Sequence, residues 1–328
     1  MEPFSLNTLL MVFGGGVIGA ALGGLWAIII CAIFALLGIG LLMAGGPDFL
    51  LLQVAFGPIF GPHVGGFGAG LVAGSYAVWR GKHPSGAAKD ILTPLIHAGG
   101  DTMLVGGVAA VAAHALLPLL AKIPLLGQSD LIAVDLFIVM IVTRLIFHKE
   151  GPLGSMESIK DGGLLNTKDY SISWAGWQSP MKVNIPIGIG AGILSASLAM
   201  GIKTALDPMV TAGTVSGVAG FVAPLVAGWA LSLVILIPLL VTDGKIQQVP
   251  VMHCFSIMGA WAFMHTGSIL VAAIAGVIAG MIQELSARVF YNHGSTHIDP
   301  PAVAIMISTF LINIIMKPEF LNVAALFK

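Results

Sequence analysis

Charge is scarce along this chain of 328 residues, in which 14 Lys and Arg and 15 Asp and Glu together make up 9% of the sequence. A soluble globular chain carries about 25% charged residues, many of which cover its water-facing surface. The scarcity therefore excludes a soluble enzyme of ordinary surface. The formal net charge of −1, with no basic block, also excludes a nucleic-acid-binding protein.

Cysteine is nearly absent as well, because only Cys31 and Cys254 occur and both lie in apolar runs. Two isolated thiols exclude a disulfide scaffold and give no reason to infer a metal site. Disorder is excluded by the hydrophobic content of 57%. The sequence does not identify a cofactor or a metal.

Long apolar runs fill most of the chain and predict an all-α polytopic integral membrane protein of the plasma or inner membrane, embedded in the lipid bilayer. At about 20 residues per span, this length allows about 10 transmembrane or half-membrane helices. Residues 8–45 contain no charge and are too long for one span, so a break near Gly23 and Gly24 is expected. The apolar runs at 49–60 and 91–100 are too short to span and predict broken or re-entrant segments.

The two halves of the chain resemble each other weakly. Residues 63–74 align without gaps on residues 265–276, an offset of 202, and Trp26 and Trp229 are offset by 203. Eight of the charged residues lie between Lys149 and Lys182. We therefore predict pseudo-symmetric membrane repeats at 1–147 and 183–328, joined by a soluble or interfacial linker at 148–182. The alternative is two unrelated glycine-rich segments in a biased composition.

Two histidines are the first candidate binding residues. His63 and His265 each precede a glycine-rich apolar run, and Gly61, Gly65 and Gly267 lie close to them. Half-helix N-termini within a membrane protein offer free N–H groups to a solute. The pattern predicts a substrate site between the repeats, and the alternative is two packed histidines.

Buried carboxylates are the candidate sites for a coupling ion or proton. Asp101 and Asp299 each precede an apolar span, with His97 and His297 nearby, and Asp135 lies inside a span. Intramembrane ionisable groups are costly and usually serve a pathway or a partner. For Asp101 and Asp299 the alternative is helix N-capping.

Other polar residues in apolar segments are assigned individually. His253 is expected to line the same cavity as His265. His293 and His297 have the spacing of a zinc pair, but Gly294 argues against a helix there. Arg144 is expected to extend to the membrane interface.

These features predict a membrane transport protein, either a secondary transporter or a channel, for a small solute or ion. Repeated halves with broken helices are typical of transporters. One alternative is an oligomeric scaffold subunit without transport activity, since the glycine-rich faces also favour a homo-oligomer. The other is an intramembrane His/Asp metal-dependent enzyme. Hydrolase, metalloprotease and Walker motifs are absent, so the sequence favours a protein that is not an enzyme.

Overall fold

A computed structural model describes residues 2–165, 174–241 and 249–315, so part of the predicted linker lies outside the described residues. Within these ranges the regular structure is helical, apart from one isolated bridge between Gly151 and Gly154. The helices before the linker are α1 Leu6–Leu22, α2 Gly24–Met43, η1 Leu50–Ala55, α3 Gly68–Trp79, η2 Ile96–Ala98, α4 Gly100–Leu120, η3 Leu126–Gln128, α5 Leu131–Thr143 and η4 Arg144–His148. Helix α6 Met156–Gly162 lies within the predicted linker. The helices that follow it are α7 Met181–Thr211, α8 Gly217–Val234, α9 Ile237–Val241, α10 His253–Thr266, α11 Ile269–Ser286, η6 Ala287–Tyr291 and α12 Pro300–Ile315.

Six of the described helical segments are long and apolar enough to cross a membrane. They are Gly24–Met43, Gly100–Leu120, Leu131–His148, Met181–Thr211, Gly217–Val241 and Ile269–Tyr291. Length and composition thus indicate a membrane location and agree with the predicted helical class. The predicted number of about 10 helices is not confirmed, because the remaining apolar helices are shorter than a full span.

The predicted break in the first apolar run is confirmed at Gly23, which separates α1 from α2 with a φ of 80°. Glycine adopts this left-handed region without the steric cost that a Cβ would impose. The segment before α4 pairs with the backbone around the break, because Leu25 N donates to Ile91 O at 2.8 Å and Leu95 N donates to Ala21 O at 3.0 Å. Backbone groups near this break therefore form hydrogen bonds with another segment of the protein.

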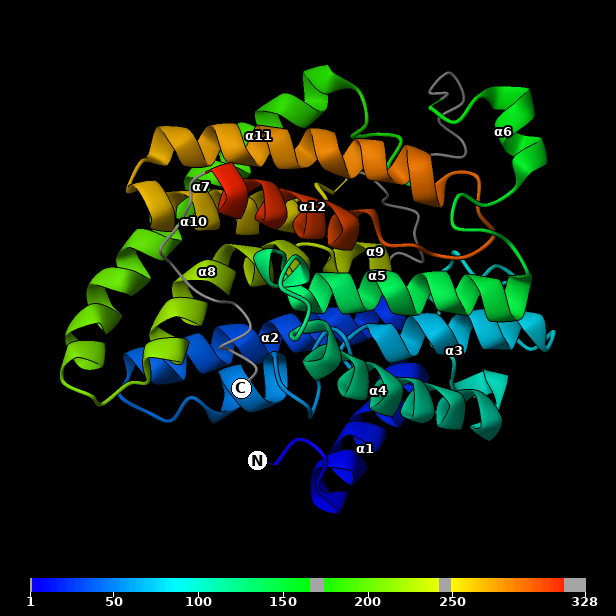
Figure 1. Ribbon diagram of the computed structural model, residues 1–328, viewed down its shortest axis with the longest axis horizontal. Coiled ribbons are helices and arrows are strands. Elements are labelled where there is room, and N and C mark those ends of the chain that lie inside the picture. Colours follow the sequence, from blue (N-terminus) through cyan, green and yellow to red (C-terminus); the bar gives the residue numbers. More distant parts are fainter. Residues whose placement is uncertain (1, 166–173, 242–248, 316–328) are drawn as a thin grey trace.

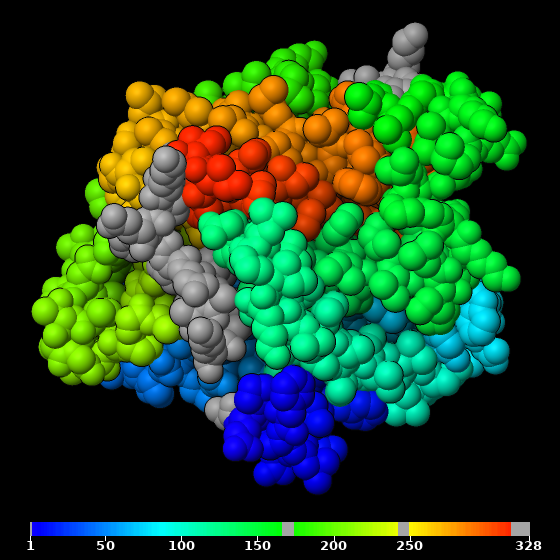
Figure 2. All heavy atoms as spheres, viewed as in Figure 1, coloured from blue at the N-terminus to red at the C-terminus, as the bar shows by residue number. Residues whose placement is uncertain are grey.

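The helices form two groups, and the main contacts between them are made by α2 and α12. In the first group α4 packs against α1, α3 and α5, and in the second α7 and α10 pack on each other and on both α8 and α11. Helix α2 joins the groups by packing on α8, and α12 joins them by packing on α5. Figure 1 shows α10, α11 and α12 along one side of the molecule and α1 to α4 along the other, with α5 between them. In the space-filling view α1 stands out at the lower edge (Figure 2).

Residues that the sequence aligns between the halves lie at different places in their helices. Trp26 is in the first turn of α2, whereas Trp229 lies near the end of α8. His63 lies in a turn before α3, whereas His265 lies in the last turn of α10. His265 therefore ends a helix, and the predicted repeats are not confirmed.

Glycines on α1 allow backbone to approach backbone. A Cβ at Gly19 would overlap the carbonyl oxygen of Gly65, and a Cβ at Gly15 would overlap that of Ile59. A similar close backbone contact occurs between α7 and α11, where a Cβ at Gly192 would overlap the carbonyl oxygen of Ala272. These small-residue faces serve helix packing inside one chain.

We expect Gly19→Ala to destabilise the protein by about 1–3 kcal/mol, because the added methyl group forces α1 away from the segment at Gly65. The matched control is Gly14→Ala on the same helix, where an added Cβ meets no atom within 4 Å. This control should be neutral or slightly stabilising, because alanine is the better helix former. Thermal unfolding of the purified variants in detergent measures the difference, and equal midpoints would contradict the close contact.

Candidate functional site

A cavity of about 1240 Å³ lies between the two groups of helices. Its walls come from both halves of the chain, with α2, α5, α8, α10 and α12 contributing side chains. Most of the lining is apolar, and the aliphatic and aromatic residues that form it include Leu25, Ile28, Phe56, Phe67, Leu136, Trp229, Leu233, Leu236, Ile257 and Trp261. The volume exceeds the roughly 300–1000 Å³ of typical small-molecule sites.

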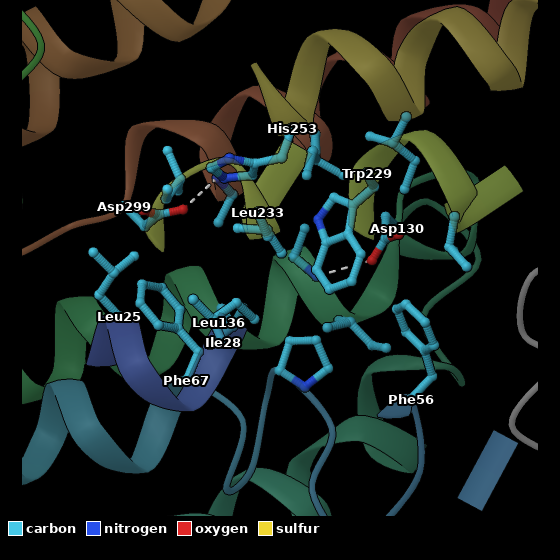
Figure 3. A pocket seen from close by; sticks show the side chains of 18 of the residues that line it. Leu25, Ile28, Phe56, Phe67, Asp130, Leu136, Trp229, Leu233, His253 and Asp299 are labelled. Atoms are coloured by element: carbon cyan, nitrogen blue, oxygen red, sulfur yellow. Dashed lines mark hydrogen bonds between the residues drawn. The ribbon is translucent and has the colours of Figure 1, made fainter. Parts of the chain in front are cut away.

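Polar side chains lie at the two ends of the view in Figure 3, with apolar side chains between them. At one end Asp130 caps α5 by accepting a hydrogen bond from Ala133 N at 2.9 Å. Trp229 is nearby, and its ring lies 5.2 Å from that of Phe56. This hydrogen bond gives Asp130 a structural role as the N-cap of α5.

The other end holds Asp299, His297 and His253, all at least nine-tenths buried. Asp299 accepts hydrogen bonds from Ala302 N at 2.8 Å and from His297 Nε2 at 3.2 Å. The first bond caps α12, which is the alternative that the sequence left open for Asp299. The second assigns the Nε2–H tautomer to neutral His297, because an ionised carboxylate can only accept.

His253 begins α10 and extends towards Asp299 (Figure 3). The Nδ1 atoms of His253 and His297 are both buried, and neither has a hydrogen-bond partner in the part of the chain that the structure describes. Buried polar atoms are nearly always paired, so two unpaired ring nitrogens at one end of a cavity point to a functional role. Aromatic rings hold His297 in place, since those of Tyr291 and Phe67 lie 5.3 and 6.1 Å from it at nearly right angles.

Lys89 extends to the same end of the cavity from the loop between α3 and α4. Its ammonium nitrogen lies 4.4 Å from the centre of the Tyr291 ring and donates to Asn292 O at 3.1 Å. Burial and the nearby Arg144 guanidinium lower the pKa of Lys89 to about 8, against the opposing effect of Glu150. With a pKa of about 8, Lys89 stays mostly charged at pH 7. The described hydrogen bonds use one of its three N–H donors.

The neighbouring carboxylate Asp90 is occupied elsewhere. It accepts hydrogen bonds from Leu92 N at 2.9 Å and from Thr93 Oγ1 at 2.6 Å. Burial alone would raise the pKa of Asp90, but these hydrogen bonds, with further ones from Ser85 and the Thr93 amide, lower it below its usual value. Asp90 is therefore an ionised turn residue, and within the described ranges no carboxylate lies within ion-pair distance of Lys89.

Of the predicted ion or proton sites, Asp299 and His297 lie together at the cavity and the others lie elsewhere. Asp101 is in the first turn of α4, one residue inside the helix rather than at its N-cap, and forms an exposed ion pair with Lys82 at 2.8 Å. His97 is exposed in η2. Asp135 is fully buried on α5, and its carboxylate oxygens have no described hydrogen-bond partner.

The predicted substrate-binding histidines do not line this cavity. His63 is 2% exposed, with Gly61 against its ring and Nδ1 without a described partner. Gly65 serves the backbone crossing with α1, and Gly267 ends α10 in the left-handed conformation. His265 also lies at this end of α10 and is half-buried. Their roles in binding stay predictions.

His293 and His297, which have the spacing of a zinc pair, have different partners in the structure. His293 interacts with Ser158 Oγ at 2.8 Å and with Leu164 O at 3.2 Å, whereas His297 pairs with Asp299. Across the described ranges no cluster of three His, Cys, Asp or Glu residues could hold a metal ion.

Lys89 is a charged cavity residue that sequence reasoning missed. In the sequence it is one of three positive charges in the basic loop at 80–89, a pattern that indicates membrane orientation. Its position depends on Tyr291 and Asn292, which lie about two hundred residues further along the chain. No local signal could have identified this contact.

Comparison with known proteins gives a family and no named relative. Neither the curated proteins nor the solved structures contain a match to this chain. One family model, described as a family of unknown function (DUF7973), matches residues 1–327. The match covers nearly the entire sequence, so the chain belongs to this family.

Proposed function

We propose that this chain is a multi-pass transport protein of the plasma or inner membrane, which moves a small solute through the cavity between its two groups of helices. The observation that carries the proposal is the cavity itself, which combines long apolar walls with a buried cluster of ionisable side chains at one end. Polar groups within a membrane protein are costly and usually mark a substrate or ion pathway. A secondary transporter fits better than an open channel, because most of the lining is apolar.

The His297–Asp299 pair is the proposed site of a coupling proton. With neutral His297 the pair carries one negative charge, and a proton added at His297 Nδ1 makes it neutral overall. That nitrogen is buried and has no described partner. Proton uptake would thus change the charge at the end of the cavity.

The two other functions fit these features less well. A scaffold subunit gains nothing from a large internal cavity with ionisable groups, and the tight glycine contacts lie inside one chain. A metal-dependent enzyme would need a ligand cluster, and the described residues contain none. Transport therefore accounts for more of the molecule.

Alternating access can be tested without knowing the substrate. Leu136 lies on α5, lines the cavity and is labelled in Figure 3. We expect Leu136→Cys to react with a membrane-impermeant sulfonated maleimide applied to either side of oriented proteoliposomes, because a transporter opens its cavity to both sides in turn. The measurement is the labelled fraction by mass spectrometry after addition from each side.

Two controls accompany this experiment. The unmodified protein should label poorly, because Cys31 and Cys254 are buried and donate to Ala55 O and Gln283 Oε1. Ala199→Cys lies on α7, is fully buried and does not line the cavity, so it should also stay unlabelled. Leu136→Cys that reacts from neither side would contradict transport, and reaction from one side only would contradict alternating access.

A further inference from the structure

The ammonium group of Lys89 lies at the end of the cavity that holds Asp299 and His297, which is called the polar end below. Among the described residues no carboxylate lies within ion-pair distance of it. A lysine ammonium has three N–H donors, and the described hydrogen bonds of Lys89 use one of them, to Asn292 O. The face of the Tyr291 ring partly stabilises the charge. A half-buried cation with unused donors fits a site whose counter-charge arrives with a ligand.

Asp299 is not that counter-charge. Its two carboxylate oxygens accept from His297 Nε2 and from Ala302 N, and the second bond also ties it to the start of α12. His253 and His297 add polar ring atoms to the same end, each with a buried Nδ1 that lacks a described partner. Lys89 and the two imidazoles thus supply a charge and further hydrogen-bonding groups around one space.

The remainder of the cavity sets the chemistry of the rest of the ligand. From the polar end the lining continues through Leu25, Ile28 and Leu136 to Trp229 and Phe56 (Figure 3). Such a surface gains stability by contact with an apolar chain or ring, because contact removes both from water.

We propose that the cavity binds a singly charged organic oxyanion, with its acidic group at Lys89 and its apolar body along the cavity walls. This inference rests on the proposed function, since it names the substrate class of the same site. Protonation of the His297–Asp299 pair removes the negative charge that would otherwise repel the ligand. Anion and proton are therefore expected to bind together.

Two sources supply this chemistry, namely a free organic acid and the phosphate head group of a membrane lipid. Octane-1-sulfonate represents the first, and it stays charged at all working pH values. Short-chain dihexanoyl phosphatidylglycerol represents the second. Octyltrimethylammonium has a similar apolar chain and the opposite charge, so it serves as the control ligand.

Equilibrium dialysis of the full-length protein in detergent with radiolabelled octane-1-sulfonate at pH 7 tests the proposal. We expect saturable binding, which Lys89→Gln weakens about tenfold and Lys89→Arg largely preserves, because the removed interaction is a charge-assisted hydrogen bond. Lys122→Gln makes the same charge change at an exposed residue outside the cavity and should leave the affinity within about twofold of the unmodified value. Competition by octyltrimethylammonium should be weak.

A pH titration of the unmodified protein gives a second test that requires no variant. The affinity should fall from pH 7 to pH 9, because burial lowers the pKa of Lys89 to about 8 and the neutral amine cannot balance the anion. The charged groups around Lys89 are Asp90, Arg144 and Glu150, with the ring of Tyr291 against it. The titratable side chains at the same end of the cavity are Asp299, His297 and His253. Lys89→Arg should remove the fall above pH 8, since arginine keeps its charge.

The outcomes separate this inference from the proposed function. No saturable binding of either anion, or equal binding by Lys89→Gln in a folded preparation, overturns the anion site, whatever the labelling of Leu136→Cys shows. Anion binding without labelling of Leu136→Cys from either side supports the site and contradicts transport. Displacement of octane-1-sulfonate by low concentrations of the phospholipid supports the anion site and assigns it to a lipid head group.

Discussion

Replacing Arg144 with methionine is expected to lower the free energy of unfolding by about 3–5 kcal/mol, a larger loss than the one expected for Gly19→Ala. Arg144 is fully buried at the end of α5. Its guanidinium donates to Thr296 Oγ1 at 2.8 Å and to the carbonyl oxygens of Thr296, Pro152 and Phe290 at 2.8–2.9 Å. Without these donors, four acceptors lose a partner, and the two on Thr296 are buried.

The measurement is thermal or denaturant unfolding of the purified variants in one detergent. Arg144→Lys should recover only part of the loss, because a lysine cannot reproduce the planar fork that reaches several acceptors. Arg80→Met is the control, since Arg80 is exposed and lies 5.7 Å from the Trp79 ring at the surface. A stability of Arg144→Met equal to that of this control would show that the buried network contributes little.

The same residue shows where sequence reasoning was wrong. Arg144 follows a long apolar run beside His148 and Lys149, which is typical of a side chain that extends to the membrane interface. In the structure it instead connects α5 to residues 290–296, immediately before His297. The acceptors are mostly backbone carbonyls, which every residue possesses, so the sequence contains no mark of them.

Asp299→Asn is expected to reduce proton-driven uptake of octane-1-sulfonate about tenfold or more in proteoliposomes. Asparagine can still accept the hydrogen bond from Ala302 N that caps α12, so the helix start should be retained. It cannot carry the negative charge that stabilises a protonated His297. The loss should therefore affect coupling rather than folding.

The matched control is Asp101→Asn, because Asp101, like Asp299, is a carboxylate that precedes an apolar span in the sequence. Asp101 lies outside the cavity in an ion pair with Lys82, and the side chains of this pair are each 40% exposed. Surface pairs of this kind contribute little, so uptake should stay within about twofold of the unmodified protein. Radiolabelled uptake with an imposed pH gradient measures both variants, and equal losses in both would contradict a special role for Asp299.

The sequence predicted the parts of the fold that local physics determines. The charge-free run, the break at Gly23 and the cap at Asp299 follow from apolar length, backbone freedom and an orphan N–H group, all of which act within a few residues. The cavity could not be predicted in this way. Lys89 meets Tyr291 only because two distant segments pack together, and the apparent His63 and His265 pairing rested on alignment in a glycine-rich composition rather than on contact.

Helix α7 has a consequence for the orientation of the molecule. Its 31 residues extend roughly 46 Å, whereas the hydrocarbon core of a bilayer is about 30 Å thick. Its last turns carry an exposed ion pair between Lys203 and Asp207, which is best accommodated in water. The turn that follows should therefore project beyond the lipid, and Gly213 within it has a positive φ and open space around it. An epitope inserted at Gly213 would report, by antibody access to intact cells, which side of the membrane this end of the molecule faces.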